Sequence, residues 1–205
     1  MISVMGLTRA EYIEKKSRFI GLLHHAETAA DVKELLEKTK HEYPDANHYT
    51  YAYILDDNQH KCSDDGEPSR TAGYPILEVI KAHGLNHTLM IVIRYFGGTL
   101  LGSGGLIRAY SHTASLALSR ATFVKKITTY YCKVTCDYNN LGNVDKIVRD
   151  QTKLDNVDYS DNIIFHFYLN ENNFIEIKEK LFNANNYQDN FVIIEETSDY
   201  PKTGY

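Results

Sequence analysis

A glycine-rich run directly after a continuous apolar stretch most restricts how this chain can fold. Five of the 12 glycines lie within residues 97–105, and the apolar stretch Leu-Met-Ile-Val-Ile occupies residues 89–93. Consecutive apolar residues of this kind are typical of a strand that is covered on both faces. After the glycines, small and apolar residues recur at helical spacing at Leu106, Tyr110, Thr113, Ala114, Ala117, Leu118 and Ala121. The sequence therefore predicts a central strand, a tight turn and a long, buried helix.

The composition is that of an ordinary globular protein, with 43% hydrophobic and 24% charged residues. A chain of 205 residues allows one or two domains. It contains no apolar run of the roughly 18 residues that a membrane span needs, and its start lacks the layout of a signal peptide. Three cysteines are an odd number and too few for a disulfide scaffold. We therefore expect a cytoplasmic protein with free thiols.

Two further strands and two further helices are predicted in the first part of the chain. Strand-forming residues fill 19–23 and 49–55. Thr28 can cap a helix together with Asp31 three residues later, and Pro44 ends that helix. A short helix is predicted to begin near Pro75 and to end at Gly84. The polar residues 56–71 before it have the composition of a long loop, a kind of segment that is often functional.

The pattern changes near residue 127, where a second domain is predicted to begin. The order from there is strand, helix, strand, strand, helix, strand. This βαββαβ order is the ferredoxin-like arrangement, a four-stranded sheet with both helices on one face. The predicted class is α+β, with domains at residues 1–126 and 127–205. The first carries 15 Lys and Arg against 14 Asp and Glu, and the second 7 against 13, so a polyanion should meet the first.

The glycine-rich run is the strongest candidate binding site. Glycines let the backbone approach a ligand closely, and free amides at the start of a helix favour an anion. Arg94 and Arg108 bracket the run and would add full charges. The predicted phosphate-binding set is Arg70, Arg94, Gly97, Gly98, Gly102, Ser103, Gly104, Gly105 and Arg108. The alternative, in which the glycines only permit a tight crossover, stays open.

The same run matches neither of the common nucleotide-binding motifs. It lacks the Gly-Lys-Ser/Thr of a Walker motif, and its glycine spacing departs from G-x-G-x-x-G. No nucleotide cofactor is therefore expected. Tyr95 and Phe96 precede the glycines and could stack on bases, although aromatic residues at a strand end are more often part of a core.

A second candidate is the acidic segment 63–73. Asp64, Asp65 and Glu67 are three carboxylates within four residues, which could hold Mg²⁺ or act as acid and base. The alternative is a solvated turn shaped by Asp-Gly and Glu-Pro steps. His60 and Cys62 lie just upstream, but their spacing fails the rules for a zinc site. No metal is expected unless the carboxylates hold Mg²⁺.

The remaining reactive side chains favour structural roles. Cys132 and Cys136 fall on the same apolar face of a predicted strand, so buried and inert thiols are expected. His24, His25 and His48 have no partner visible in the sequence and are interpreted as core or surface residues.

Several segments together resemble the YigZ/IMPACT family. They are Lys16-Ser17-Arg18-Phe19-Ile20, Ala46-Asn47-His48 with Ala52-Tyr53, Ser63 to Pro68, Thr71-Ala72-Gly73, and Arg94 to Gly98 continuing through Leu101-Gly102, Gly104-Gly105-Leu106 and Arg108-Ala109-Tyr110. The resemblance covers residues 15–121. The second part is similar in pattern to the ferredoxin-like domain of bacterial members, which is itself likened to the last domain of elongation factor G.

The resemblance implies a first domain like the second domain of a small-subunit ribosomal protein, with helices on one side of its sheet. It also implies an RNA- or ribosome-associated role in translation control. Eukaryotic members restrain a kinase through an extra N-terminal domain that is not in this sequence, so that role is not carried over. Two positions depart from the family pattern: Thr50 stands where cysteine is common, and Arg70 where glycine is common. The first weakens any thiol mechanism, and the second favours an anion.

The leading hypothesis is a non-enzymatic protein that binds RNA or the ribosome through Arg70, Arg94, Arg108 and the glycine run. One alternative is an Mg²⁺-dependent hydrolase or phosphoryl-handling enzyme that uses the acidic segment. Another is a protein-interaction module whose docking face is the acidic second domain.

Overall fold

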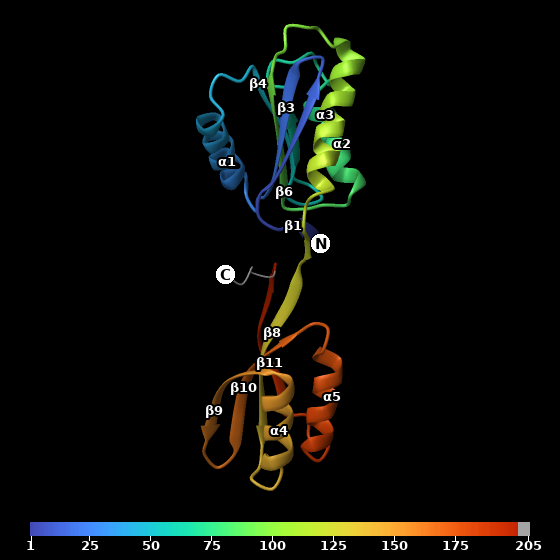
Figure 1. The fold of residues 1–205 in the computed structure, drawn as a ribbon. Coiled ribbons are helices and arrows are strands. Elements are labelled where there is room, and N and C mark those ends of the chain that lie inside the picture. Colours follow the sequence, from blue (N-terminus) through green and yellow to red (C-terminus); the bar gives the residue numbers. More distant parts are fainter. Residues whose placement is uncertain (201–205) are drawn as a thin grey trace. The chain divides into compact units, whose positions relative to one another are not determined.

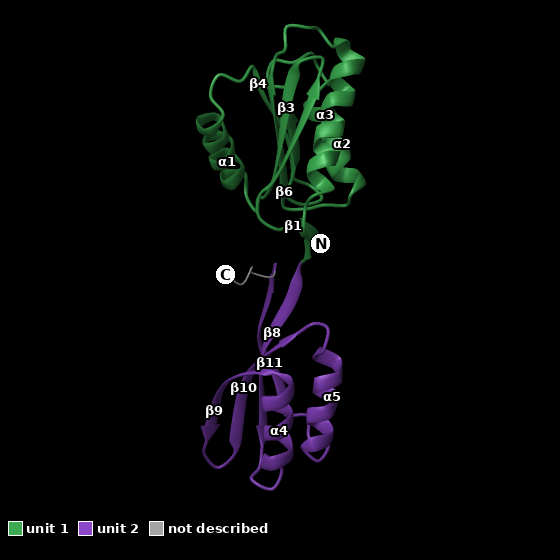
Figure 2. Cartoon of the chain, viewed as in Figure 1, with its two compact units in different colours: residues 1–125, 203–205 green, residues 126–202 purple. Residues whose placement is uncertain are grey.

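The structure, a computed structural model, describes residues 1–200. The chain divides into two compact units, one formed by Met1–Lys125 and a second that begins at Lys126 (Figure 2). Each unit has its own hydrophobic core, so each is described by itself.

The first unit is built on a five-stranded antiparallel sheet in the order β2-β3-β6-β4-β5. Its strands are β2 (Thr8–Glu14), β3 (Ser17–His25), β4 (His48–Ile54), β5 (His60–Ser63) and β6 (Thr88–Tyr95). β6 is the middle strand, which confirms the prediction for residues 89–93. Near its end Arg94 lies opposite Phe19 of β3 on one side and His48 of β4 on the other. The register therefore brings together, at one end of the sheet, the segments that contain Phe19, His48 and Arg94, which lie far apart in the sequence.

Helices cover both faces of this sheet (Figure 1). They are α1 (Ala29–Glu42), α2 (Gly73–Ala82) and α3 (Gly102–Leu118). Phe19 and Leu23 of β3 pack with Tyr110 of α3, whereas Ile20 on the opposite face packs with Val32 of α1. The α+β class is confirmed, but the expectation that all helices lie on one side is wrong. It fails because β3 and β6 are apolar on both faces and α1 covers the second.

Local signals in the sequence explain where the helices begin and end. The side chains and backbones of Thr28 and Asp31 form the reciprocal capping box at the start of α1. Gly84 follows α2 with φ of +61°, a conformation that favours glycine. No helix in residues 1–200 is both long and apolar enough to span a membrane.

The sequence analysis missed four short or polar strands. β2 was not predicted, and β5 lies inside the predicted loop 56–71, where its four residues pair with β4. β1 (Ile2–Val4) and β7 (Phe123–Lys125) pair as a separate two-stranded sheet. β1, β5 and β7 are only three or four residues long, and four of the seven residues of β2 are polar, so none of these strands gives a clear apolar alternation.

The second unit has the predicted βαββαβ order. Its elements are β8 (Ile127–Cys136), α4 (Leu141–Gln151), β9 (Lys153–Tyr159), β10 (Ile163–Asn170), α5 (Phe174–Ala184) and β11 (Phe191–Asp199). The sheet order is β11-β8-β10-β9. Val144 and Val148 of α4 and Ile177 of α5 share one core with Phe165 and Phe167 of β10. Both helices therefore cover the same face, as the ferredoxin-like prediction requires.

Cys132 and Cys136 lie in this core, as predicted. Both side chains are buried, and burial raises the pKa of the Cys132 thiol to about 12 and that of Cys136 to about 11. Thiols with such pKa values are poor nucleophiles at neutral pH.

His24 of β3 gives the first unit a pH-dependent stability. Its Nε2 is buried without a hydrogen-bond partner among the described residues. Burial lowers the pKa of His24 to about 4. The positive charge of Lys38 lowers this pKa further, and the negative charge of Glu42 partly offsets the decrease. An unfolded histidine has a pKa of about 6.5, so the unfolded chain binds more protons between the two values. We expect the free energy of unfolding to decrease by about 2 kcal/mol as pH falls from about 6.5 to about 4, allowing for the ring's partial exposure.

The measurement is urea unfolding of the full chain and of a His24→Gln variant at several pH values across that window. The variant should lose stability less steeply as pH falls, because glutamine cannot take up the proton. Parallel pH profiles for the two proteins would contradict the assignment to His24.

Candidate functional site

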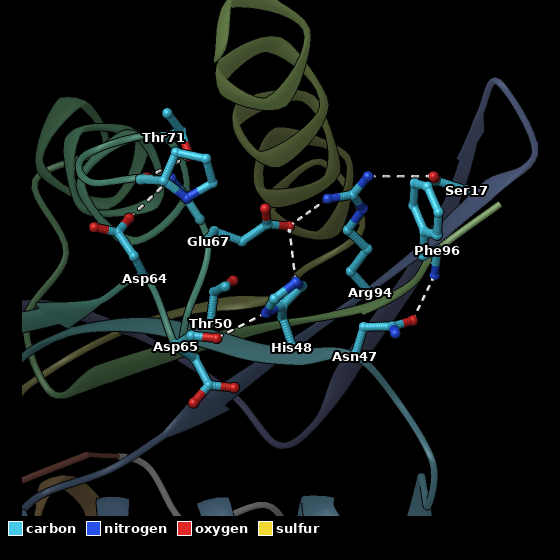
Figure 3. A network of polar contacts seen from close by, with 12 residues as sticks. Ser17, Asn47, His48, Thr50, Asp64, Asp65, Glu67, Thr71, Arg94 and Phe96 are labelled. Atoms are coloured by element: carbon cyan, nitrogen blue, oxygen red, sulfur yellow. Dashed lines mark hydrogen bonds and ion pairs between the residues drawn. The ribbon is translucent and has the colours of Figure 1, made fainter. Parts of the chain in front are cut away.

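A buried ion pair joins Arg94 to Glu67 (Figure 3). Nη1 of Arg94 on β6 is 2.5 Å from Oε1 of Glu67, which lies in the loop before α2. The two side chains are only 6% and 3% exposed. The hydroxyl of Tyr110 on α3 donates to the same carboxylate oxygen at 2.7 Å. Burial and this hydrogen bond to the Glu67 carboxylate raise the pKa of the Tyr110 phenol, so it remains a donor. The two charges therefore neutralise each other inside the protein.

The surroundings of Arg94 explain why it is held in place. Its guanidinium lies 5.4 Å from the ring centre of Phe19 and 5.5 Å from that of Phe96. Nη2 donates to the hydroxyl of Ser17 at 3.4 Å, while Nε is buried with no partner among the described residues. A phosphate that used Arg94 would have to compete with Glu67. The predicted phosphate contact of Arg94 remains a prediction, but the structure gives this residue a structural partner.

His48 belongs to the same network. Its Nδ1 is 2.8 Å from the carbonyl oxygen of Asp65, and its Nε2 is 3.7 Å from Oε1 of Glu67. A carbonyl oxygen only accepts, so Nδ1 donates to it, and Nε2 faces the carboxylate of Glu67. The sequence analysis treated His48 as a core or surface residue. Its partner is 19 positions away, and only the segment Ala46-Asn47-His48 in the family resemblance hinted at a role.

The three carboxylates of the acidic segment have different partners (Figure 3). Asp64 accepts hydrogen bonds from the backbone amides of Arg70, Ala72 and Gly73 at 2.8, 3.0 and 2.9 Å, which holds the start of α2. Asp65 accepts from the amide of Tyr49 at 2.6 Å, and Glu67 faces Arg94. Within residues 1–200 no group of three His, Cys, Asp or Glu side chains is placed to hold a metal ion. The Mg²⁺ site of the alternative hypothesis required convergence of the three carboxylates, and the structure does not bring them together.

The glycine run and the acidic segment together line a cavity of about 440 Å³. Its lining residues are Asn47, His48, Glu67, Pro68, Arg94, Phe96, Leu100, Leu101, Gly102, Ser103 and Leu106. Phe96 is 46% exposed and Leu100 is 83% exposed. Tyr95, in contrast, packs against the core on the α1 face, and its hydroxyl donates to the carbonyl of Pro44. Of the two aromatic residues predicted to stack on bases, Phe96 is thus the one at the cavity.

The predicted glycines have separate tasks. Gly97 packs so tightly on the turn between β2 and β3 that a Cβ would overlap the backbone of Lys16 and Ser17. Gly98 and Gly102 have φ of +80° and +69° with open space around them. Gly104 and Gly105 lie in the first turn of α3, where Leu101 provides no side-chain cap. The packing interpretation therefore applies to Gly97, and the role of the other glycines in binding stays a prediction.

The other two predicted arginines are exposed beside the start of α3. Arg70 lines one hollow together with Ser103. Arg108 lines a second hollow with Gly105 and Lys15, and its Nη1 lies 3.6 Å from where a Cβ of Gly104 would be. The exposed cations near the first turns of α3 are thus Arg70, Arg108 and Lys15, and not Arg94.

The family profile of the Impact N-terminal domain matches residues 15–118, slightly more than half of the chain. The chain belongs to the IMPACT family. The IMPACT family member YvyE of Bacillus subtilis is 40% identical over 164 residues, which cover 78% of this chain and 76% of YvyE. YigZ of Escherichia coli is 33% identical over 186 residues, covering 88% and 91%. A crystal structure described as a hypothetical protein superposes with a TM-score of 0.61 at 30% identity, covering 95% and 97%. The resemblance stated from the motifs is confirmed.

The departures of this chain from the IMPACT pattern now have structural explanations. Arg70 has φ of +62°. Glycine adopts this backbone conformation without steric cost, which explains why glycine is common at this position in the family. Its guanidinium lies 4.2 Å from the ring centre of Tyr74, which holds the side chain on the surface. Thr50 is buried, and its hydroxyl donates to the carbonyl of Val92 at 2.9 Å. The threonine thus satisfies its own polar group inside the sheet.

Proposed function

We propose that this IMPACT-family chain binds RNA, alone or within the ribosome, and acts in the control of translation without catalysing a reaction. The observation that carries the proposal is the placement of exposed Arg70 and Arg108 in two hollows that share the first turns of α3. Arginine binds phosphate well because its planar fork matches phosphate geometry. The context of translation comes from the family resemblance described above.

The electrostatics of this surface support the proposal. The exposed residues Gly102, Ser103 and Gly104 begin a 17-residue helix, whose first amides carry about half a positive charge. The carboxylates nearby are already engaged, because Glu14 accepts from Tyr12 at 2.6 Å and Glu78 lies 3.7 Å from Lys81. The uneven charge of the two parts of the sequence also favours the first unit as the one that meets a polyanion.

The test is the salt dependence of binding to labelled single-stranded and structured RNA. The double substitution Arg70→Ala and Arg108→Ala should weaken binding to all sequences. It should also reduce the slope of log K against log salt by about 1.4 on single strands, because each lost phosphate contact removes about 0.7. An unchanged slope would remove both arginines from the interface.

Arg120→Ala is the matched control. Arg120 is an exposed arginine of the same unit just beyond the end of α3, so its removal changes the net charge as much as either single substitution does, at a different position. Its slope should equal that of the unaltered chain. Absence of any RNA binding at low salt would overturn the free-RNA form of the proposal.

A further inference from the structure

The cavity of about 440 Å³ below the glycine run has the chemistry of a site for a small, partly aromatic ligand. Its size lies in the range of ligand pockets, which combine apolar walls with a few fixed polar groups. Leu100, Leu101 and Leu106 supply the apolar part, and Phe96 supplies an aromatic ring that is 46% exposed. An exposed aromatic ring next to exposed leucine is a stacking surface for a planar group.

The polar lining of this cavity has two buried side chains and several more accessible groups. Glu67 and Arg94 are 3% and 6% exposed in their side chains and are fixed to each other. The buried Nε of Arg94 has no hydrogen-bond partner in the described chain. His48 adds an imidazole that is oriented by the carbonyl of Asp65. Asn47 accepts from the amide of Phe96 through Oδ1, which leaves its Nδ2 as a donor. Such a mixture of fixed donors and acceptors suits the edge of a nucleobase.

One end of the same cavity lies at the start of α3. Gly102 and Ser103, the first residues of α3, are among its lining residues, and both are exposed. Backbone amides at this position point toward a ligand and favour negative charge. The helix start does not stand alone as evidence, because the same cavity is lined by Arg94, whose side chain is 6% exposed and whose Nε has no hydrogen-bond partner within residues 1–200. A single cavity thus offers a stacking ring, base-edge partners and a phosphate position.

We propose that this cavity holds one unpaired nucleotide, with its base against Phe96 and its phosphate at Gly102 and Ser103. The inference rests on the proposed RNA binding and deepens it. It predicts that the bound RNA has an unpaired or terminal nucleotide whose base is not stacked on its neighbours. The exposed arginines would contact the continuing backbone, while the cavity selects for a free base. Contacts between the arginines and phosphate would not by themselves distinguish duplex RNA from single-stranded RNA.

The first experiment titrates the full chain with the four nucleoside 5′-monophosphates, with ribose 5-phosphate and with inorganic phosphate, followed by NMR of the Phe96 and Ser103 amides. At least one nucleotide should bind about tenfold or more tightly than ribose 5-phosphate, because only the nucleotide carries a base. Phe96→Ala should weaken that binding by about 5- to 150-fold, the range that loss of base stacking gives. Equal affinity for nucleotide and ribose 5-phosphate would overturn the proposal.

Phe123→Ala is the matched control, since Phe123 lies on β7 of the same unit and is 45% exposed. It should leave nucleotide binding unchanged. Ser103→Glu tests the phosphate end separately. It should weaken the binding of nucleotides, because the added carboxylate repels their phosphate, and it should change the affinity for the bare nucleoside by no more than about twofold. If Phe96→Ala and Phe123→Ala have equal effects, the ring is not the stacking surface.

The second experiment separates this inference from the proposed function. RNA hairpins with and without an unpaired overhang are compared for binding to the unaltered chain and to Phe96→Ala. The overhang should increase affinity, and Phe96→Ala should abolish the difference. Equal binding of both hairpins, with the effects of Arg70 and Arg108 intact, would overturn the nucleotide site and leave RNA binding in place. Nucleotide binding without RNA binding would support the site and contradict the proposed function.

Discussion

Replacing Glu67 by alanine is expected to decrease the free energy of unfolding of the first unit by about 3–5 kcal/mol. The change leaves the guanidinium of Arg94 buried without its counter-charge, and it removes the acceptor of the Tyr110 hydroxyl. An uncompensated buried charge costs far more than the pair contributes when intact. Hydrogen exchange of the β6 amides measures this unit by itself, because the second unit has its own core.

Two comparisons make this expectation specific. Glu78→Ala removes an exposed carboxylate, 50% exposed and 3.7 Å from Lys81, and should cost less than about 1 kcal/mol. The double substitution Glu67→Leu with Arg94→Met should restore most of the lost stability, because it removes both charges together. A loss below about 1 kcal/mol for Glu67→Ala would contradict the buried pair.

The ion pair changes how binding experiments on this family should be designed. Sequence reasoning selects Arg94 for alanine substitution, because it begins the glycine-rich motif. In the folded chain that substitution strands the carboxylate of Glu67 in the interior. A loss of RNA binding by Arg94→Ala would therefore report on folding as much as on contact. Arg70 and Arg108, which are exposed, give the cleaner test.

The parts of the fold that could be predicted are those with local signals. The capping pair Thr28 and Asp31 specifies the start of α1, and the apolar run 89–93 specifies the middle strand. The side of the sheet that α1 covers has no local signal, since residues 89–93 are apolar on both faces. It follows from tertiary packing of Val32 against the face that carries Ile20.

In the candidate site, too, some features could be predicted from the sequence and others could not. Its segments could be recognised from composition and from the family resemblance, but their pairing could not. Glu67 and Arg94 are 27 positions apart, and nothing local indicates that this one carboxylate of the acidic segment is buried while Asp64 holds the start of α2. The neighbouring strands β4 and β6 bring His48 opposite Arg94. Register, which sequence reasoning did not assign, therefore determines the site.

Gly97→Ala is expected to destabilise the first unit by at least about 3 kcal/mol. The added methyl would overlap the carbonyl carbon of Lys16 and the amide nitrogen of Ser17 in the turn between β2 and β3. Overpacking against side chains costs about 1–3 kcal/mol because side chains can move, whereas here the obstacle is backbone. The amide of Gly97 also donates to the hydroxyl of Ser17 at 3.1 Å, so the two segments cannot separate without losing that bond.

Neighbouring glycines of the same run provide the controls for Gly97→Ala. Gly98→Ala has open space around it and should cost only about 1–2 kcal/mol, the strain of a φ of +80°. Gly104→Ala lies inside α3, where the nearest atom is the flexible Arg108 guanidinium at 3.6 Å, and should stabilise by about 0.5–1 kcal/mol. Urea unfolding of the three variants should thus give effects of different size and sign. Equal losses at all three positions would mean that conformational freedom, and not contact with the β2–β3 turn, is the reason for glycine at position 97. The predicted order instead makes Gly97 the contact that holds this turn, and with it Ser17, against Arg94 and the glycine run.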